Sequence, residues 1–149
     1  MSKAETQFVY VTYIVATRDA VWRALTDPEI TKRYWIHANI SDWKPGSAWE
    51  HQRIDGSGVA DVVGYVIENV PEERLVFSWA APGEQTDPAK VSRVRFDLAE
   101  HKPGVVRLTV THYDLEPGSG MERGISEGWP QVLSNLKTLL ETGTAATLW

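Results

Sequence analysis

The sequence of 149 residues contains no cysteine and has fewer basic than acidic residues, 15 against 20. The absence of cysteine excludes disulfides, thiolate zinc sites, iron–sulfur clusters and thiol catalysis. A net charge of −5 opposes a broad electrostatic attraction to nucleic acid or anionic lipid. No stretch approaches the roughly 20 apolar residues that span a bilayer, and the N-terminus lacks a signal-peptide core. We therefore expect a cytoplasmic protein that neither binds nucleic acid nor inserts stably into a membrane.

Sequence motifs for catalysis and for cofactor binding are also missing. The four histidines, at positions 37, 51, 101 and 112, show no His-Glu-x-x-His or comparable metal-ligand spacing. No glycine-rich phosphate loop, Ser-His-Asp order or Gly-x-Ser-x-Gly elbow occurs. The sequence predicts no metal site, no cofactor and no catalytic residue, so a non-enzymatic protein is the first hypothesis.

What the chain does contain is a long amphipathic segment near its C-terminus, between Gly128 and Glu141, within a last helix that we expect after roughly position 120. Its apolar side chains fall at offsets of 0, 3, 4, 7, 10 and 11, which is one helical face. These residues are Trp129, Val132, Leu133, Leu136, Leu139 and Leu140. About seven strand-like runs precede the segment, so one helix must cover a large sheet. A bent sheet closed over a single helix tends to leave space, which suggests a pocket.

The order of the other elements follows from runs of β-branched and aromatic residues separated by turn residues. We expect a strand at 8–15, short helices at 17–25 and 28–34, and strands at 47–54, 59–70, 74–80, 91–99 and 105–113. Residues between Trp35 and Trp49 show no regular pattern. The chain has no internal repeat, so we expect one domain over residues 1–149.

Two glycines and a proline complicate the start of the last helix. Pro130 favours a helix that is kinked or starts late, since an interior proline costs about 3 kcal/mol. Gly124 and Gly128 lie four residues apart and would share one side of a helix. Their missing side chains would widen a pocket beside Met121 and Ile125, and both interpretations are compatible.

Three stretches of the chain resemble the family named after the activator of Hsp90 ATPase. They are Ala20–Pro28, the segment from Gly64 through Val70-Pro71-Glu72-Glu73-Arg74-Leu75, and Gly128-Trp129 with the leucines that follow. The family belongs to the START-like, or SRPBCC, superfamily. The resemblance implies an α+β helix-grip fold, in which a curved antiparallel sheet of about six to seven strands wraps around a long C-terminal helix. Two short helices would follow the first strand.

The resemblance implies a hydrophobic cavity without naming its ligand, because the superfamily includes lipid carriers, plant hormone and allergen proteins, polyketide aromatases or cyclases, and co-chaperones. Our leading hypothesis is a protein that binds a small hydrophobic or aromatic molecule between the last helix and the sheet. The residues expected to line the cavity are Trp49, His51, Tyr65, Phe77, Trp79, Phe96, Val110, His112, Met121, Ile125 and Trp129.

Some polar residues could serve chemistry instead. A second hypothesis is an aromatase or cyclase in which His112, Arg53 or Tyr65 moves protons inside the cavity. His112 also has a simpler interpretation as a hydrogen-bonded core histidine. Arg93 and Arg95 alternate with apolar residues and are expected on a solvated outer face, although an arginine in a dry cavity would bind a carboxylate. A third hypothesis, from the resemblance, is contact with an Hsp90-type chaperone in a stress response. A homodimer is also possible.

Overall fold

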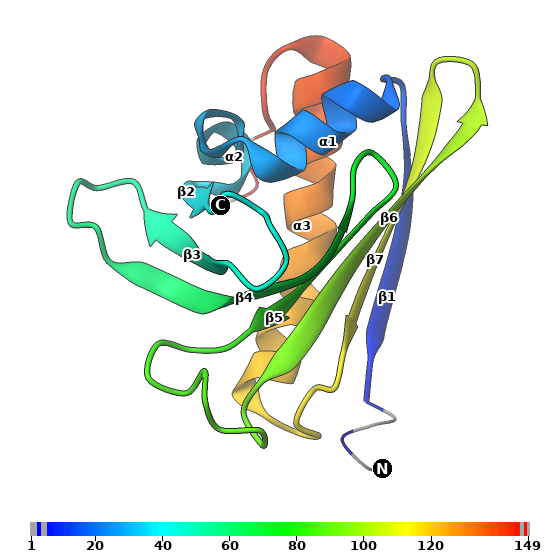
Figure 1. Cartoon of the computed structure of the whole chain (residues 1–149). Coiled ribbons are helices and arrows are strands. Elements are labelled where there is room, and N and C mark those ends of the chain that lie inside the picture. The colour runs from blue at the N-terminus through cyan, green and yellow to red at the C-terminus, as the bar shows by residue number, and fades with distance from the viewer. Residues whose placement is uncertain (1–2, 4–5, 147, 149) are drawn as a thin grey trace.

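Seven antiparallel strands form one curved sheet with the order β1-β7-β6-β5-β4-β3-β2 in the computed structural model (Figure 1). The structure describes residue 3, residues 6–146 and residue 148. The long helix α3 runs along one face of this sheet, and the short helices α1 and α2 pack against α3 and β2. The predicted helix-grip fold is therefore confirmed.

The bounds of the elements agree with the expected ones to within a few residues, including the start of the last helix near position 120. In chain order they are β1 Phe8–Ile14, α1 Arg18–Thr26, α2 Pro28–Trp35, β2 His37–Ile40, β3 Ala48–Arg53, β4 Ala60–Val70, β5 Arg74–Trp79, β6 Ser92–Lys102, β7 Val105–Tyr113 and α3 Gly120–Thr142. The strand β2 was not predicted. It has four residues and one β-branched side chain, so it lacks a strand pattern of its own and forms by pairing with β3.

The helix α3 begins at Gly120, ten residues before the proline that suggested a late start. The Ser119 side chain caps it by accepting a hydrogen bond from the backbone N–H of Glu122, at 3.1 Å. Pro130 lies inside the helix, so of the two interpretations that the proline left open, a kink or a late start, the late start is excluded. Packing of the helix against the sheet offsets what the proline costs.

The short helices begin as their sequences predict. The Thr17 side chain accepts from the backbone N–H of Ala20, and the Asp27 carboxylate accepts from that of Glu29, with proline at the following position. The helix α2 ends at Trp35, and the C-cap residue Ile36 adopts a left-handed conformation with φ of 57°. A β-branched residue rarely adopts this conformation, because it costs on the order of 1–3 kcal/mol.

The hydrophobic core lies between the concave face of the sheet and the apolar face of α3. Leu75, Phe77 and Phe96 from the sheet are buried there with Leu133 and Leu136 from the helix. In β5 the aromatic side chains point inward, as their alternation predicts. The middle of the interface is thus filled with side chains, which leaves space for a guest molecule only toward one part of α3.

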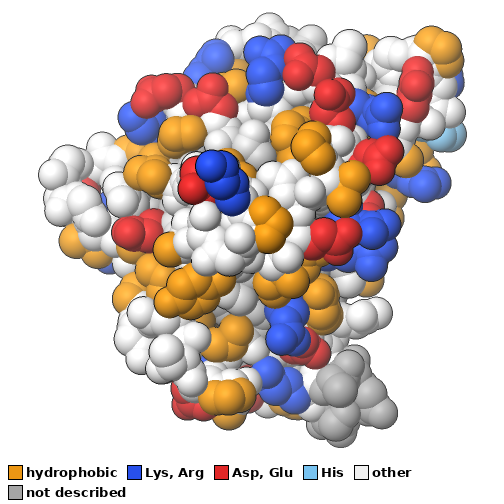
Figure 2. Space-filling view, viewed as in Figure 1, with side chains coloured by type: hydrophobic (Ala, Val, Ile, Leu, Met, Phe, Trp, Pro, Cys, Tyr) orange, Lys and Arg blue, Asp and Glu red, His pale blue; other side chains and the backbone are white. Residues whose placement is uncertain are grey.

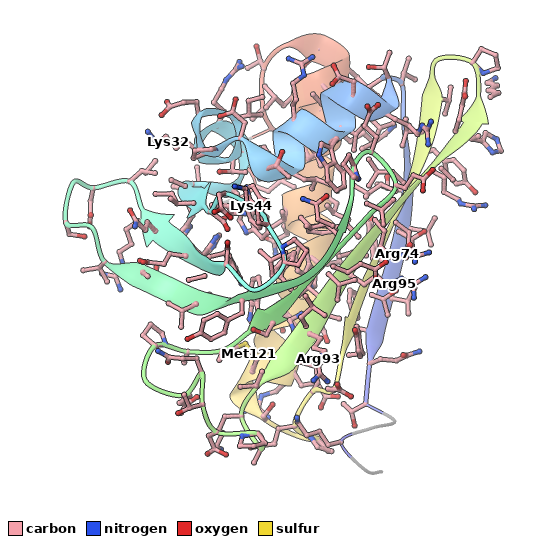
Figure 3. All side chains as sticks on the ribbon, viewed as in Figure 1. Lys32, Lys44, Arg74, Arg93, Arg95 and Met121 are labelled. Carbon is pink, nitrogen blue, oxygen red and sulfur yellow. The ribbon has the colours of Figure 1, made fainter. Side chains whose placement is uncertain are left out.

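The face of the sheet turned away from α3 carries charged side chains among apolar ones (Figures 2 and 3). Arg74 and Arg95 both pair with Asp97, with Nε–Oδ distances of 3.1 and 2.7 Å, and Arg93 pairs with Asp114. These arginines are about half exposed, so each pair stabilises the fold by about 0–1 kcal/mol. The predicted solvated position of Arg93 and Arg95 is confirmed.

A close approach at Gly64 shapes the middle of the sheet. The Trp49 indole crosses this glycine, and its Nε1 donates to the Ser78 carbonyl oxygen at 2.7 Å. A Cβ atom at position 64 would lie 2.0 Å from that oxygen and 2.6 Å from Trp49 Nε1. Only glycine fits, which explains why this position belongs to the stretches that carry the family resemblance.

We expect Gly64→Ala to lower the free energy of unfolding by about 3 kcal/mol or more, because the methyl group would overlap a backbone carbonyl that cannot move freely. Urea denaturation measures the change. Gly124→Ala is the matched control, since a Cβ there meets no atom within 4 Å, and it should not destabilise the protein. Equal stability of Gly64→Ala and the wild-type protein would contradict this account of the sheet.

Candidate functional site

Two glycines of α3 open a hollow beside the core. Gly124 and Gly128 lie one turn apart, and a Cβ atom added to either would meet nothing within 4 Å. A hollow of about 230 Å³ lies beside them. We call it the aromatic groove, and its lining residues are Trp35, His51, Trp79, Gly124, Ile125, Gly128, Trp129 and Val132. The interpretation that the glycines widen a pocket therefore agrees with the structure.

Three tryptophans from three different elements wall the aromatic groove. Trp35 ends α2, Trp79 ends β5, and Trp129 lies at the middle of α3. The ring centroid of Trp129 lies 5.3 Å from that of Trp35 and 5.7 Å from that of Trp79, with interplanar angles of 61° and 48°. Rings packed at such angles support one another and give the groove stiff, flat walls.

The groove continues outward past the end of α2. A more open hollow of about 420 Å³ shares Trp35, His51, Gly128 and Val132 with it, and adds Ile36 and His37. The left-handed backbone of Ile36 directs the chain from Trp35 into His37, so a strained residue lies between two residues of this wall. Backbone strain of this kind often occurs where binding surfaces are held in place.

Apart from the indole N–H groups of the tryptophans, the His51 ring is the one polar group among the side chains that line the aromatic groove, and only 5% of its surface is exposed. Its Nδ1 donates to Asn39 Oδ1, and the Asn39 backbone N–H is held by Thr31 Oγ1 at 3.0 Å. Its Nε2 makes no hydrogen bond to any residue that the structure describes. Burial, and then the neighbouring His37, lower the pKa of His51 to about 3, so the ring is neutral near pH 7.

A charged group on the outer side supports His51. The His37 ring stacks on the His51 ring at a centroid distance of 4.0 Å, and its Nε2 lies 2.8 Å from Asp61 Oδ2. Arg53 also binds this carboxylate, and the two partners, Arg53 first, lower the pKa of Asp61 to about 2. The carboxylate therefore stays ionised and fixes the orientation of His37 against His51.

His112 is a structural histidine. The Trp129 Nε1–H is a donor only and gives its hydrogen to His112 Nδ1 at 3.0 Å, so the ring proton is on Nε2. That proton is directed at Ser92 Oγ, 2.7 Å away. The ring therefore cannot accept the serine proton, and burial lowers its pKa to about 3. Both nitrogens are occupied, which agrees with the simpler of the two interpretations of this residue.

The structure brings together four of the eleven residues expected to line a cavity. His51, Trp79, Ile125 and Trp129 line the aromatic groove. Five others are packed inside the core beside it, and these are Trp49, Phe77, Phe96, Val110 and His112. They support the groove from behind and do not line it.

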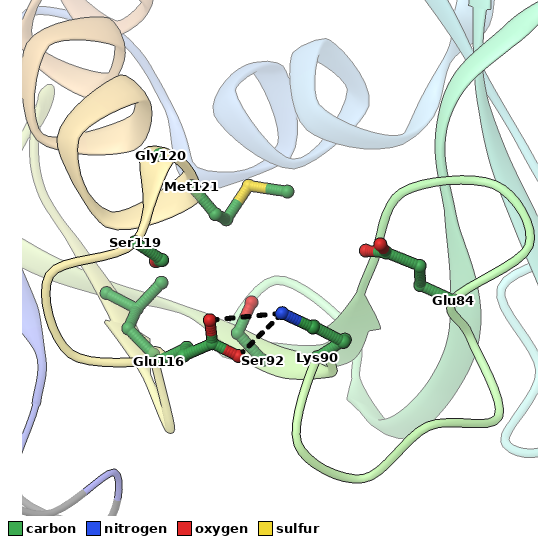
Figure 4. A pocket seen from close by; sticks show the side chains of 8 residues that line it. Glu84, Lys90, Ser92, Glu116, Ser119, Gly120 and Met121 are labelled. Carbon is green, nitrogen blue, oxygen red and sulfur yellow. Dashed lines mark hydrogen bonds and ion pairs between the residues drawn. The ribbon is translucent and has the colours of Figure 1, made fainter.

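The remaining two expected residues lie elsewhere. Tyr65 is on the outer face of β4 and 47% exposed, because Val62, Gly64 and Val66 take the inward positions. Its placement in the cavity is wrong. Met121 lines a separate hollow of about 270 Å³ between the start of α3 and residues 84–92 (Figure 4). Its sulfur accepts a hydrogen bond from Trp79 Nε1 at 3.1 Å, so Met121 and Trp79 lie between the two hollows.

The second hollow is a weaker candidate for ligand binding. An ion pair between Lys90 and Glu116, at 3.1 Å, crosses it, and Ser119 is engaged as the helix cap (Figure 4). In the part of the chain that the structure describes, no three His, Asp or Glu side chains gather as a metal site. None of the described helices has the length and apolar character needed to cross a membrane.

Sequence reasoning missed Trp35 and Val132 as lining residues. Val132 belongs to the apolar face of the last helix, so its helical spacing could have suggested it. Trp35 offers no such signal, because it follows a short helix and precedes the unpredicted strand β2. Its position depends on the packing of α2 against α3, two helices that are far apart in the sequence.

The two buried histidines predict an acid sensitivity. Each has a pKa near 6.5 in the unfolded chain and about 3 in the folded protein, so the unfolded state binds more protons between these values. The contribution of these two neutral histidines to the free energy of unfolding is therefore present in full above about pH 6.5, and it is lost as the pH drops toward 3. We expect each histidine to lower the free energy of unfolding by about 1 kcal/mol per pH unit between pH 6 and 5.

Urea denaturation across this pH range tests the effect. In the variant His112→Gln, the free energy of unfolding should depend less steeply on pH than in the wild-type protein. The difference in slope should equal the contribution of one histidine. His101→Gln changes an exposed residue near the end of β6 and should leave the dependence as it is. An unchanged slope in His112→Gln would show that this ring is not held neutral by the fold.

Comparisons with known proteins agree with this architecture. The chain is similar to the Aha1 dimer from Colwellia psychrerythraea, with a TM-score of 0.75 and 20% identity over 93% of this chain and 98% of that one. It is similar to DynU16, a protein from the dynemicin biosynthetic locus, with a TM-score of 0.73 and 22% identity over 93% of this chain and 48% of that one.

It is also similar to PFC0360w, an Hsp90 activator from Plasmodium falciparum, with a TM-score of 0.72 and 18% identity over 91% of this chain and 96% of that one. At these identities the likeness shows the fold alone. No curated protein matches the sequence. The sequence model of one family, described as activator of Hsp90 ATPase homolog 1-like protein, matches residues 15–141. The chain therefore belongs to this family.

Proposed function

We propose that the protein binds a small, flat and mostly apolar molecule in the aromatic groove. The observation that carries this proposal is the pair of glycines in α3. Gly124 and Gly128 have room for a side chain, yet they leave the tryptophan walls uncovered. A glycine inside a helix costs about 0.5–1 kcal/mol relative to alanine. Neither a close backbone contact nor a positive φ requires glycine at these two positions. The effect of the glycines is therefore the free space that they leave beside the tryptophans, and ligand binding would give that space a role.

The size of the groove favours ligands of one or two rings. Its volume of about 230 Å³ exceeds the cavity of about 150 Å³ that holds a benzene molecule in an engineered protein. It lies just below the range of about 300–1,000 Å³ that is common for ligand sites. The wider hollow of about 420 Å³ at the mouth offers room for a substituent on the ring.

Filling the groove should separate stability from binding. We expect Gly128→Leu to abolish binding of naphthalene-sized aromatics, because its side chain would project into the free space of the aromatic groove. The same change should raise the free energy of unfolding by about 1 kcal/mol, since it removes a helix glycine and buries apolar surface. Quenching of tryptophan fluorescence measures binding, and urea denaturation measures stability.

Glu127→Leu is the matched control, because it places the same side chain on the exposed side of the same helix. It should retain the affinity of the wild-type protein. Equal affinity of Gly128→Leu and Glu127→Leu for the same aromatic would sink the proposal. Indifference of the wild-type protein to a panel of aromatics and fatty acids would do so as well.

The placement of polar residues favours binding over catalysis. The aromatase or cyclase hypothesis needs a convergent polar cluster in the cavity, formed by His112, Arg53 or Tyr65. His112 has both ring nitrogens engaged in the core. Arg53 is half exposed and bound to Asp61, and Tyr65 faces outward. The groove itself offers a single neutral imidazole. One such group can form a hydrogen bond to a ligand, but it lacks the second polar group that proton transfer in a cyclase would need.

Contact with an Hsp90-type chaperone is a second candidate, favoured by the family match and by the fold shared with an Hsp90 activator. Charged surface residues would form such a contact. Arg93 and Arg95, which form exposed ion pairs on the outer face of the sheet, are the residues that we propose for it. We expect Arg93→Glu/Arg95→Glu to weaken capture by a cognate Hsp90 at least tenfold in a pull-down, while Gly128→Leu retains it. Failure of Hsp90 to capture the wild-type protein would remove this candidate.

A second copy of this chain is another partner that we propose, since one protein of the same fold is a dimer.

A further inference from the structure

The aromatic groove contains a hydrogen-bond acceptor that no residue of the described chain satisfies. The Nδ1 atom of His51 is engaged by Asn39, but its Nε2 atom has no partner, although the side chain is 95% buried. This Nε2 atom is not among the fully buried atoms without a partner, which in the described chain are Asn69 Oδ1 and Asn135 Oδ1, so it is reached from the groove and can accept a hydrogen bond from a ligand. We infer that the ligand of the groove is an aromatic hydroxyl compound of the phenol class, whose O–H donates to His51 Nε2. This inference rests on the proposed function.

The tautomer of His51 follows from its neighbours. Asn39 presents its side-chain oxygen, which is an acceptor, so His51 Nδ1 carries the proton. Thr31 holds the backbone of Asn39, which limits the movement of that side chain. The lone pair is therefore on Nε2. The ring is neutral near pH 7, because burial lowers its pKa to about 3, and the lone pair is available to a donor.

The other polar groups of the groove do not compete for this role. The indole N–H of Trp79 is engaged by Met121, and that of Trp129 by His112. The indole N–H of Trp35 has no partner among the described residues, and its ring lies 4.9 Å from the His51 ring. A hydroxyl both donates and accepts, so it suits an acceptor and a donor in adjacent rings. A bare hydrocarbon would suit neither of them, and an ether oxygen would suit only the donor.

The flat walls and the size of the hollow supply the rest of the specificity. Three tryptophans can contact both faces and the edge of a planar ring, whereas a saturated chain would leave these faces incompletely covered. No carboxylate or ammonium lines the groove, so a charged ligand would lose hydration without gaining a partner. An uncharged phenol or naphthol avoids both costs.

A matched pair of ligands tests the inference. Isothermal titration calorimetry should show that 2-naphthol binds the wild-type protein about tenfold more tightly than 2-methoxynaphthalene, which is the scale of one buried hydrogen bond. The methoxy compound has the same rings but no O–H, and its extra methyl group would otherwise favour it. In His51→Phe the preference should disappear, while His101→Phe, at an exposed position near the end of β6, should retain it.

A measurement on the unaltered protein covers the case in which His51→Phe does not fold. Nitrogen-15 NMR of the histidine rings should show a shift of the His51 Nε2 resonance on addition of 2-naphthol but not of 2-methoxynaphthalene. Equal affinities for the two compounds, or an unmoved Nε2 resonance, would overturn the inference and leave the proposed function standing. Tighter binding of 2-naphthaldehyde than of 2-naphthol would also overturn it, because Nε2 would then be a donor. No binding of any of these compounds would count against the proposed function itself.

Discussion

The packing of one helix into a curved sheet is the constraint on which this structure depends. The helix α3 presents its apolar face to the concave side of seven strands, and Leu133 and Leu136 fill the middle of that interface. Where α3 has no side chain, at Gly124 and Gly128, the contact with the sheet is incomplete. The same packing that stabilises the fold therefore defines the position and the depth of the groove.

The groove is rigid because its walls are also part of the core. Trp79 and Trp129 have their indole nitrogens engaged by Met121 and His112, so their rings cannot turn freely. His51 is held between Asn39 and the stacked ring of His37. A site built in this way loses little conformational entropy when it binds a ligand, which favours affinity from a small contact area. The strained Ile36 backbone is a local cost, and it lies at the mouth of this site.

Most of the fold could be predicted from the sequence, because it depends on local patterns. The spacing of apolar residues predicts α3, and the caps at Thr17 and Asp27 predict the short helices. The site was predicted only in part, because it depends on which face of each strand turns inward. In β4 both faces carry apolar residues, so alternation could not decide between Tyr65 and Gly64. Trp35 enters the groove through contacts that no short segment encodes.

The central claim is that a planar aromatic binds between Trp35, Trp79 and Trp129. Two-dimensional NMR of the indole N–H groups measures this directly during a titration with 2-naphthol. The account predicts that the resonances of these three tryptophans shift together and saturate, while those of Trp22, Trp43 and Trp49 stay in place. Shifts spread over all the tryptophans, or confined to those outside the groove, would contradict it.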